Sequence, residues 1–334
     1  MSYDDHFLAK IEEAATNIFL ALSVVATIWM TNFGAVNPGI FFECLRNIDK
    51  ILFISPGPIF SKFPLLIIVV HLQTLLIIAY DSYSWIVVES LELFLHNIIR
   101  NAQYMHTILS LGLLVWMTME TSARYKKLTE RIEDIFQVNR SEIITNITYN
   151  IQIQANYQLK LIQDIRLISR VYNILCNVVD TLNSIFGATI LFYCLFVVFF
   201  VVEYLTLLIL FGLSAYHTRA TDETILKWGS YVWIAENCIK IMALASAGEN
   251  LSREANRTIT VCYGIINTLD NNPQYNVDAI KEELNFLIQQ AAHRKPCLSA
   301  SGFFVANSTM MGFIIGSITS YVIVAVQFLK ETSP

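Results

Sequence analysis

The sequence has little formal charge, little glycine and little proline for its length. Of its 334 residues only 15% are charged, while 55% are hydrophobic, and the mean hydropathy is +0.52. An ordinary soluble domain carries about 25% charged residues, so that class is excluded. With 12 Gly, 7 Pro and no run of short alternating segments, an outer-membrane barrel is disfavoured as well. The sequence therefore predicts an all-α, polytopic membrane protein.

Signals for chemistry are also missing. The six cysteines, at positions 44, 176, 194, 238, 262 and 297, show no C-x-x-C spacing, so neither a disulfide framework nor a zinc site is expected. No Walker loop, G-x-G-x-x-G, G-x-S-x-G or H-E-x-x-H motif occurs. The six histidines do not lie at the spacing of a helical metal pair. We expect no enzyme, no cofactor, no metal and no nucleic-acid partner.

Long apolar stretches predict six transmembrane helices, since about 20 mostly apolar residues cross a bilayer. Residues 34–39 and a turn around residues 81–84 are expected to interrupt helices, and the stretch after Gly39 is expected to be a loop. The six predicted segments are 14–33, 63–80, 86–119, 185–216, 225–247 and 302–328.

Two polar stretches separate these segments. Residues 120–170 hold eight Lys or Arg with apolar residues at helical intervals. Leu161, Ile165, Ile168 and Tyr172 recur at four, three and four, so a helix is predicted to continue unbroken from there into the fourth span near Ile185. A second amphipathic helix is predicted from Val277 to Ala292, capped by Asn276, with one apolar side formed by Ile280, Leu284, Leu287, Ile288 and Ala291. These stretches divide the chain into transmembrane parts (1–119 and 185–247), cytoplasmic parts (120–184 and 248–300) and a final span (301–328).

Basic residues predict the orientation. Segments 34–62, 120–170 and 248–300 contain 16 Lys or Arg, whereas the four segments on the other side contain 4. By the positive-inside rule the first group is cytoplasmic, so both termini are predicted to be extracellular. The outer segments have a net charge of −6, which would either concentrate cations or simply complement the basic inner loops.

A few charged residues fall inside predicted spans. Glu203 is either a functional acid or a side chain that reaches the membrane interface. Glu236 and Lys240, four residues apart, are predicted to form a helical ion pair that reduces the cost of both charges.

Polar and aromatic residues gather in the outer halves of spans two to five. An interfacial aromatic belt and a ligand pocket between helices both explain them. The pocket candidates are Gln73, Tyr80, Asn97, Tyr104, Trp228 and Tyr231.

The last span carries a polar stripe at three-four-three spacing, formed by Ser317, Ser320, Val324 and Gln327. Such a stripe either packs against a neighbouring helix or lines a water-filled pore.

The end of the chain resembles the C-terminal signature of the insect gustatory receptor family, part of the insect chemoreceptor superfamily. Ser320 and Tyr321 are followed by five apolar residues and then by Gln327 and Phe328, where the family has Thr-Tyr, five apolar residues and Gln-Phe. Outside this signature the similarity is one of layout, including the short motif of residues 47–52.

This resemblance implies a ligand-gated, non-selective cation channel of four subunits in the plasma membrane. It implies a pore lined by the last helix, with Val324 at the hydrophobic gate and Gln327 at the polar constriction. It further implies an outward-facing pocket for a small-molecule tastant and an anchor of cytoplasmic helices, for which segments 161–178 and 277–292 are candidates. Partners would be permeant cations, membrane lipid and other gustatory receptors in a homo- or heterotetramer.

The family has seven spans with a cytoplasmic N-terminus, whereas six are predicted here, so the family's first span is expected to be absent. Two other functions remain open. A secondary transporter would couple ions through Glu203, Glu236 or Lys240, but the two matching halves of such proteins are not visible in the sequence. A non-conducting interaction protein would be monomeric in mild detergent.

Overall fold

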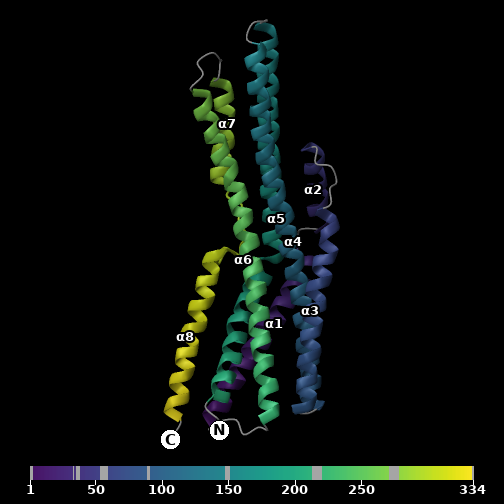
Figure 1. Ribbon diagram of the computed structural model, residues 1–334, viewed down its shortest axis with the longest axis vertical. Coiled ribbons are helices and arrows are strands. Elements are labelled where there is room, and N and C mark those ends of the chain that lie inside the picture. The colour runs from purple at the N-terminus through teal and green to yellow at the C-terminus, as the bar shows by residue number, and fades with distance from the viewer. Residues whose placement is uncertain are drawn as a thin grey trace.

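The protein is a bundle of long helices, and no β-strand occurs among the residues that the structure describes. The structure, a computed structural model, describes residues 3–32, 34, 38–52, 59–88, 91–146, 151–212, 220–270 and 278–332. The helices run mostly along the long axis of the molecule (Figure 1). They are α1 (Tyr3–Asn32), α2 (Pro38–Ile51), α3 (Ile59–Val88), α4 (Leu91–Asn146), α5 (Ile151–Gly212), α6 (Ala220–Asp270), α7 (Asp278–His293) and α8 (Ser308–Thr332).

Three helices, α4, α5 and α6, carry the core from one end of the molecule to the other. Leu114 and Leu128 of α4, Leu175 and Ile190 of α5, and Leu251 of α6 are all fully buried. The remaining helices pack on this trio. Helix α1 contacts α4 and α5, α3 contacts α4 and α6, and α2 contacts α4 and α5. Helices α7 and α8 each contact α5 and α6.

Both ends of the chain lie at the bottom of the view in Figure 1, whereas α7 and the distal ends of α4 and α5 lie at the top. We call the lower part the membrane half; it contains α1, α3, α8 and the adjoining parts of α4, α5 and α6. We call the upper part the distal half; it contains α2, α7 and the remaining parts of the three long helices. Because both ends lie on the same side of the molecule, the helices between them cross the membrane half an even number of times.

The two halves have different surfaces. Large apolar side chains are exposed on the membrane half: Ile18, Val25, Trp29, Leu72, Leu76 and Phe313. Exposed residues of the distal half include Lys126, Arg131, Arg166, Arg170 and Arg253. Apolar side chains are stable at such positions when lipid surrounds them. Two stretches, Lys10–Asn32 and Gln158–Ile209, are long and apolar enough to cross a membrane, and shorter apolar helices cover Ile68–Tyr83 and Ser308–Val324.

Most predicted elements are confirmed. The six predicted spans overlap α1, α3, α4, α5, α6 and α8, so their helical character is confirmed. Helix α5 continues unbroken from Ile151 into the membrane half, as its periodicity predicts. Helix α7 buries the five residues predicted for its apolar side. Its predicted cap, Asn276, lies outside the described residues.

Two predicted interruptions of a helix and one predicted helix start were wrong. The stretch after Gly39 is helix α2 rather than a loop, because Phe41, Leu45 and Ile48 recur on one face and are buried. Residues 81–84 are helical, since the buried Asp81 accepts a hydrogen bond from Trp233 and is held inside the bundle. Residues 302–307 do not begin the last span, because the chain turns there at Ser301 and Gly302, which have φ angles of 51° and 83°.

The segment from Arg294 to Asn307 connects α7 to α8 and is fixed between α5 and α6. The Asn183 side chain of α5 donates to the Cys297 carbonyl (2.9 Å) and accepts from the Ser299 N–H (2.8 Å). The chain approaches both helices at glycines. A Cβ at Gly187 would lie 2.9 Å from the Ser301 nitrogen, and one at Gly248 would lie 1.9 Å from the Ala306 carbonyl oxygen. The connection therefore sets the point from which α8 starts.

Helix α8 starts at a side-chain cap. The Asn307 Oδ1 accepts hydrogen bonds from the Thr309 N–H (3.0 Å) and the Met310 N–H (3.4 Å), which a helix leaves without partners at its start. We expect Asn307→Ala to cost about 1 kcal/mol of stability, because the Thr309 N–H loses its acceptor, while the Met310 N–H keeps only the Asn307 backbone carbonyl (3.1 Å). Asn307→Asp should stay close to the original protein. Thermal unfolding in detergent checks this, and equal stability of the Ala and Asp variants would contradict the cap.

All six cysteines are described and are free thiols. Cys262 lies in the distal half on α6 and is fully buried. Burial raises the pKa of the Cys262 thiol to about 12, because a thiolate would lose its hydration there.

Candidate functional site

A polar cluster lies inside the membrane half, between α3, α4 and α6. Glu236 and Lys240 form an ion pair on α6, as their spacing predicts, and their side chains are 2% and 12% exposed. Gln73 of α3 donates to Glu236 (2.9 Å), as does Thr74 (3.3 Å). Lys240 donates to the Tyr104 hydroxyl of α4 (3.3 Å) and lies 4.9 Å from the centre of that ring. Three helices are thus joined through one buried charge pair.

The cluster continues toward α5 through a shared asparagine. Asn237 Oδ1 accepts from the hydroxyls of Tyr104 and Tyr193, each at 3.4 Å, and its Nδ2 donates to the Trp233 carbonyl. The Trp233 indole N–H donates to Asp81 of α3 at 3.0 Å. The polar atoms at this level of the bundle are therefore largely satisfied by each other.

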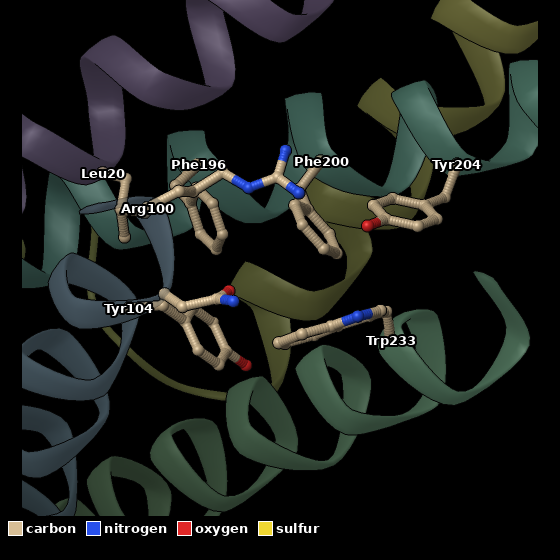
Figure 2. Close-up of a pocket in the computed structure, with 8 residues that line it drawn as sticks. Leu20, Arg100, Tyr104, Phe196, Phe200, Tyr204 and Trp233 are labelled. Carbon is tan, nitrogen blue, oxygen red and sulfur yellow. The ribbon is translucent and has the colours of Figure 1, made fainter. Parts of the chain in front are cut away.

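Next to the polar cluster lies a small cavity with an aromatic wall, shown in Figure 2. The rings of Tyr104 and Trp233 meet edge to face at 5.0 Å, and those of Phe196 and Phe200 lie 5.1 Å apart. The cavity is about 10 Å³ in volume and is lined by Leu20, Arg100, Asn101, Tyr104, Phe196, Phe200, Tyr204 and Trp233. That volume holds about one water molecule, whereas ligand pockets measure about 300–1,000 Å³. An organic ligand could enter only if these side chains moved apart.

Arg100 closes one side of the cavity. In Figure 2 its guanidinium group projects over the rings of Phe196 and Phe200 toward Tyr204. Tyr204 and Glu203 of α5, Asp81 of α3 and Glu13 of α1 all favour its positive charge.

Glu203 faces the interior of the bundle. It accepts a hydrogen bond from Thr16 of α1 at 2.9 Å, in addition to its interaction with Arg100. The hydrogen bond joins α1 and α5 at this half-buried acid.

Two buried asparagines lie on α4. Asn97 and Asn101 are 5% and 8% exposed and lie one helical turn apart. No hydrogen bond joins either carboxamide to another residue in the part of the chain that the structure describes. Only Asn101 lines the cavity.

The predicted pocket residues do not form one site. Gln73, which is itself exposed, and Tyr104 belong to the polar cluster, and Asn97 is buried on α4. The other three are exposed on the membrane half: Tyr80 (38%), Trp228 (63%) and Tyr231 (55%). The Tyr80 hydroxyl donates to the Ile225 carbonyl at 3.1 Å, and the Trp228 and Tyr231 rings meet 6.2 Å apart. Exposure of these three is the pattern of an aromatic belt.

Of the eight residues that line the cavity, only Tyr104 is among the six pocket candidates from the sequence. The missed residues include Leu20, Arg100, Asn101, Phe196 and Phe200. The phenylalanines lie in an apolar run that gives no hint of which side faces inward. Asn101 and Tyr104 are three residues apart on α4, so helical spacing could have placed them on one face.

The predicted pore residues lie on α8 at the edge of the bundle (Figure 1). Met310 and Ile314 are buried against the bundle, and Tyr321 meets Phe199 of α5 at 5.9 Å. Ser317 is half-buried, whereas Ser320, Val324 and Gln327 are exposed. Ser320 donates to the Gly316 carbonyl of its own helix. The Phe328 side chain is outside the described part. The exposed members of the stripe thus do not pack on another helix of the described chain.

Among the described residues no group of three or more His, Cys, Asp or Glu side chains could hold a metal ion. The site offers aromatic surface, a few hydrogen-bonding groups and an offset charge cluster, which are features of a binding site.

The chain was compared with known proteins. A family model described as "7tm Chemosensory receptor" matches residues 9–331. Among curated proteins no match is found. The chain is similar in fold to the insect olfactory receptor OR5 from Machilis hrabei, solved in complex with eugenol. The TM-score is 0.61 at 11% sequence identity, and the match covers 96% of this chain and 82% of that receptor.

Proposed function

The chain belongs to the 7tm chemosensory receptor family, and from this premise we propose that it is a gustatory receptor that works as a ligand-gated, non-selective cation channel. Family membership confirms the predicted place in the insect chemoreceptor superfamily and the prediction of a receptor rather than an enzyme. The gustatory assignment is supported by the Ser320-Tyr321 and Gln327-Phe328 signature at the end of the chain.

The observation that carries the channel proposal is the double role of α5. On one side of this helix, Tyr193, Phe196 and Phe200 reach the polar cluster and the cavity. On other positions of the same turns, Cys194 contacts Met310 (3.7 Å) and Phe199 contacts Tyr321, both on α8. A ligand that moves the aromatic wall would therefore move the helix on which α8 rests. Ligand binding would shift the closed and open populations through this contact.

In this proposal four copies of α8 surround one pore. The exposed stripe of Ser320, Val324 and Gln327 faces the axis, with Val324 at the gate and Gln327 at the constriction. Segments 120–184 and 248–300 form the cytoplasmic anchor, and both termini are extracellular. Partners are a small-molecule tastant, permeant cations, membrane lipid and three further subunits, identical or from other gustatory receptors.

Electrical recording from cells that express the chain, alone and with co-receptors, tests the proposal against a panel of tastants. We expect a ligand-dependent cation current at the plasma membrane. A chain that reaches the surface and carries no current with any tastant or co-receptor would favour a non-conducting interaction protein.

The gate residue gives a sharper prediction. Val324→Ser should produce a current without ligand, because a ring of hydroxyls holds water where a ring of valines excludes it. Ile323→Ser is the matched control, since Ile323 is exposed to a similar degree (53% against 45%) but lies off the stripe. Equal basal conductance of the two variants at equal surface expression would place the gate elsewhere.

A further inference from the structure

The polar atoms around the cavity are almost all engaged by protein partners. The Tyr104 hydroxyl donates to Asn237 and accepts from Lys240. The Trp233 N–H donates to Asp81, and the Arg100 charge is offset by Glu203 and Asp81. A ligand that used these groups would have to break existing interactions.

Asn101 is the exception. Its side chain is more than nine-tenths buried and lines the cavity, and its carboxamide forms no hydrogen bond with the described residues. A buried amide without a partner is unfavourable, so a group from outside the chain is expected to supply one. The carboxamide offers both a donor and an acceptor, and it can therefore bind a hydroxyl or a carbonyl oxygen.

The rest of the wall is suited to a flat ring. Tyr104, Phe196, Phe200 and Trp233 form a continuous series, with centroids 5.0 to 6.0 Å apart along the contacts that join them. Aromatic surfaces prefer offset or edge-to-face contact with another ring. Because the cavity measures only about 10 Å³, an entering ring must separate these side chains, which favours an occupant of one ring.

We propose that Asn101 determines ligand class, and that the cavity accepts single-ring aromatic compounds carrying one hydrogen-bonding oxygen. This inference rests on the proposed function, because it assigns the class of tastant. A sugar presents many hydroxyl groups, and only one carboxamide on the wall is without a partner. Most hydroxyls of a sugar would lose water without gaining a hydrogen bond, so sugars are excluded from this cavity.

Three compounds that differ at a single carbon test the proposal: 1-phenylethanol, acetophenone and ethylbenzene, with sucrose as the sugar. Binding is measured as the thermal stabilisation of the purified full chain, and gating as current in expressing cells. The alcohol and the ketone should bind about 10- to 100-fold more tightly than ethylbenzene, since they alone pair with the carboxamide.

Asn101→Leu should remove that advantage and leave ethylbenzene binding within about threefold, because the change removes only the hydrogen-bonding group. Asn97→Leu is the matched control, since Asn97 is equally buried but does not line the cavity. Asn97→Leu should still bind the alcohol and the ketone more tightly than ethylbenzene, to the same degree as the original protein. Asn101→Ala is the second variant, for the case in which leucine packs poorly, and it should also bind the three compounds alike.

The outcomes separate this inference from the proposed function. Binding that depends on Asn101 without any current supports the inference and contradicts the channel. A current evoked by sucrose, with no binding of the aromatic compounds, supports the channel and overturns the inference. An unchanged advantage of the alcohol and ketone in both Asn101 variants, or an equal loss in Asn97→Leu, also overturns it.

Discussion

Replacing Gly248 by alanine should cost about 3 kcal/mol of stability and abolish the ligand-evoked current. The new Cβ would lie 1.9 Å from the Ala306 carbonyl oxygen and 3.4 Å from the Leu298 Cβ. The first of these is a backbone atom of the connection that precedes α8, so the clash can be relieved only by moving that connection. Helix α8 would then start from a different position, and its stripe would no longer face the proposed axis.

Gly264→Ala is the control for this prediction, because it lies on the same helix and a Cβ there would meet no atom within 4 Å. That variant should gain roughly 0.5–1 kcal/mol, since glycine weakens a helix interior. Thermal unfolding and surface-normalised current are measured for both. A Gly248→Ala protein with normal stability and normal current would show that the connection yields and does not fix α8.

Lys240→Met should destabilise the protein by about 3–5 kcal/mol, because it leaves the Glu236 carboxylate buried without a cation. Gln73 and Thr74 would still donate to that carboxylate, but neither carries a charge. The Tyr104 hydroxyl would lose a donor at the same time. At about 2–4 °C per kcal/mol, the melting temperature in detergent should fall by roughly 10 °C.

The double variant Lys240→Met with Glu236→Gln distinguishes a charge effect from a packing effect. The amide introduced at position 236 would keep partners in Gln73 and Thr74, and no unpaired charge would remain. Stability should return to within about 1 kcal/mol of the original, as replacement of a whole buried pair is often neutral. A double variant as unstable as the single one would mean that the lysine stem, rather than its charge, supports the bundle.

The sequence alone predicted the helices well, because long periodic runs determine them locally. The five buried residues of α7 and the unbroken course of α5 both follow from spacing along the chain. Helix α2 was missed because Pro38 and Gly39 were interpreted as breakers. Proline at the first position of a helix does not prevent the helix from forming.

The site was much less predictable. Glu236 and Lys240 were found because both lie on one helix, four residues apart. Their partners Gln73, Thr74 and Tyr104 come from other helices, and no local pattern states which helices will be neighbours. Aromatic residues at the same depth, such as Trp228 and Trp233, are alike in sequence, but one is 63% exposed and the other 4%. Only the packing of the helices determines which of the two side chains is buried.

The length of α5 has a mechanical consequence. Its 62 residues extend over about 93 Å at 1.5 Å per residue. About 30 Å of this crosses the hydrocarbon core, so roughly 60 Å projects beyond it. If the helix moves as a rigid rod, a tilt of only about 2° at the aromatic wall displaces its far end by roughly 2 Å, which is comparable to the helix shifts of known switching proteins. The contacts of α5 in the distal half would therefore respond to a single ring entering the cavity.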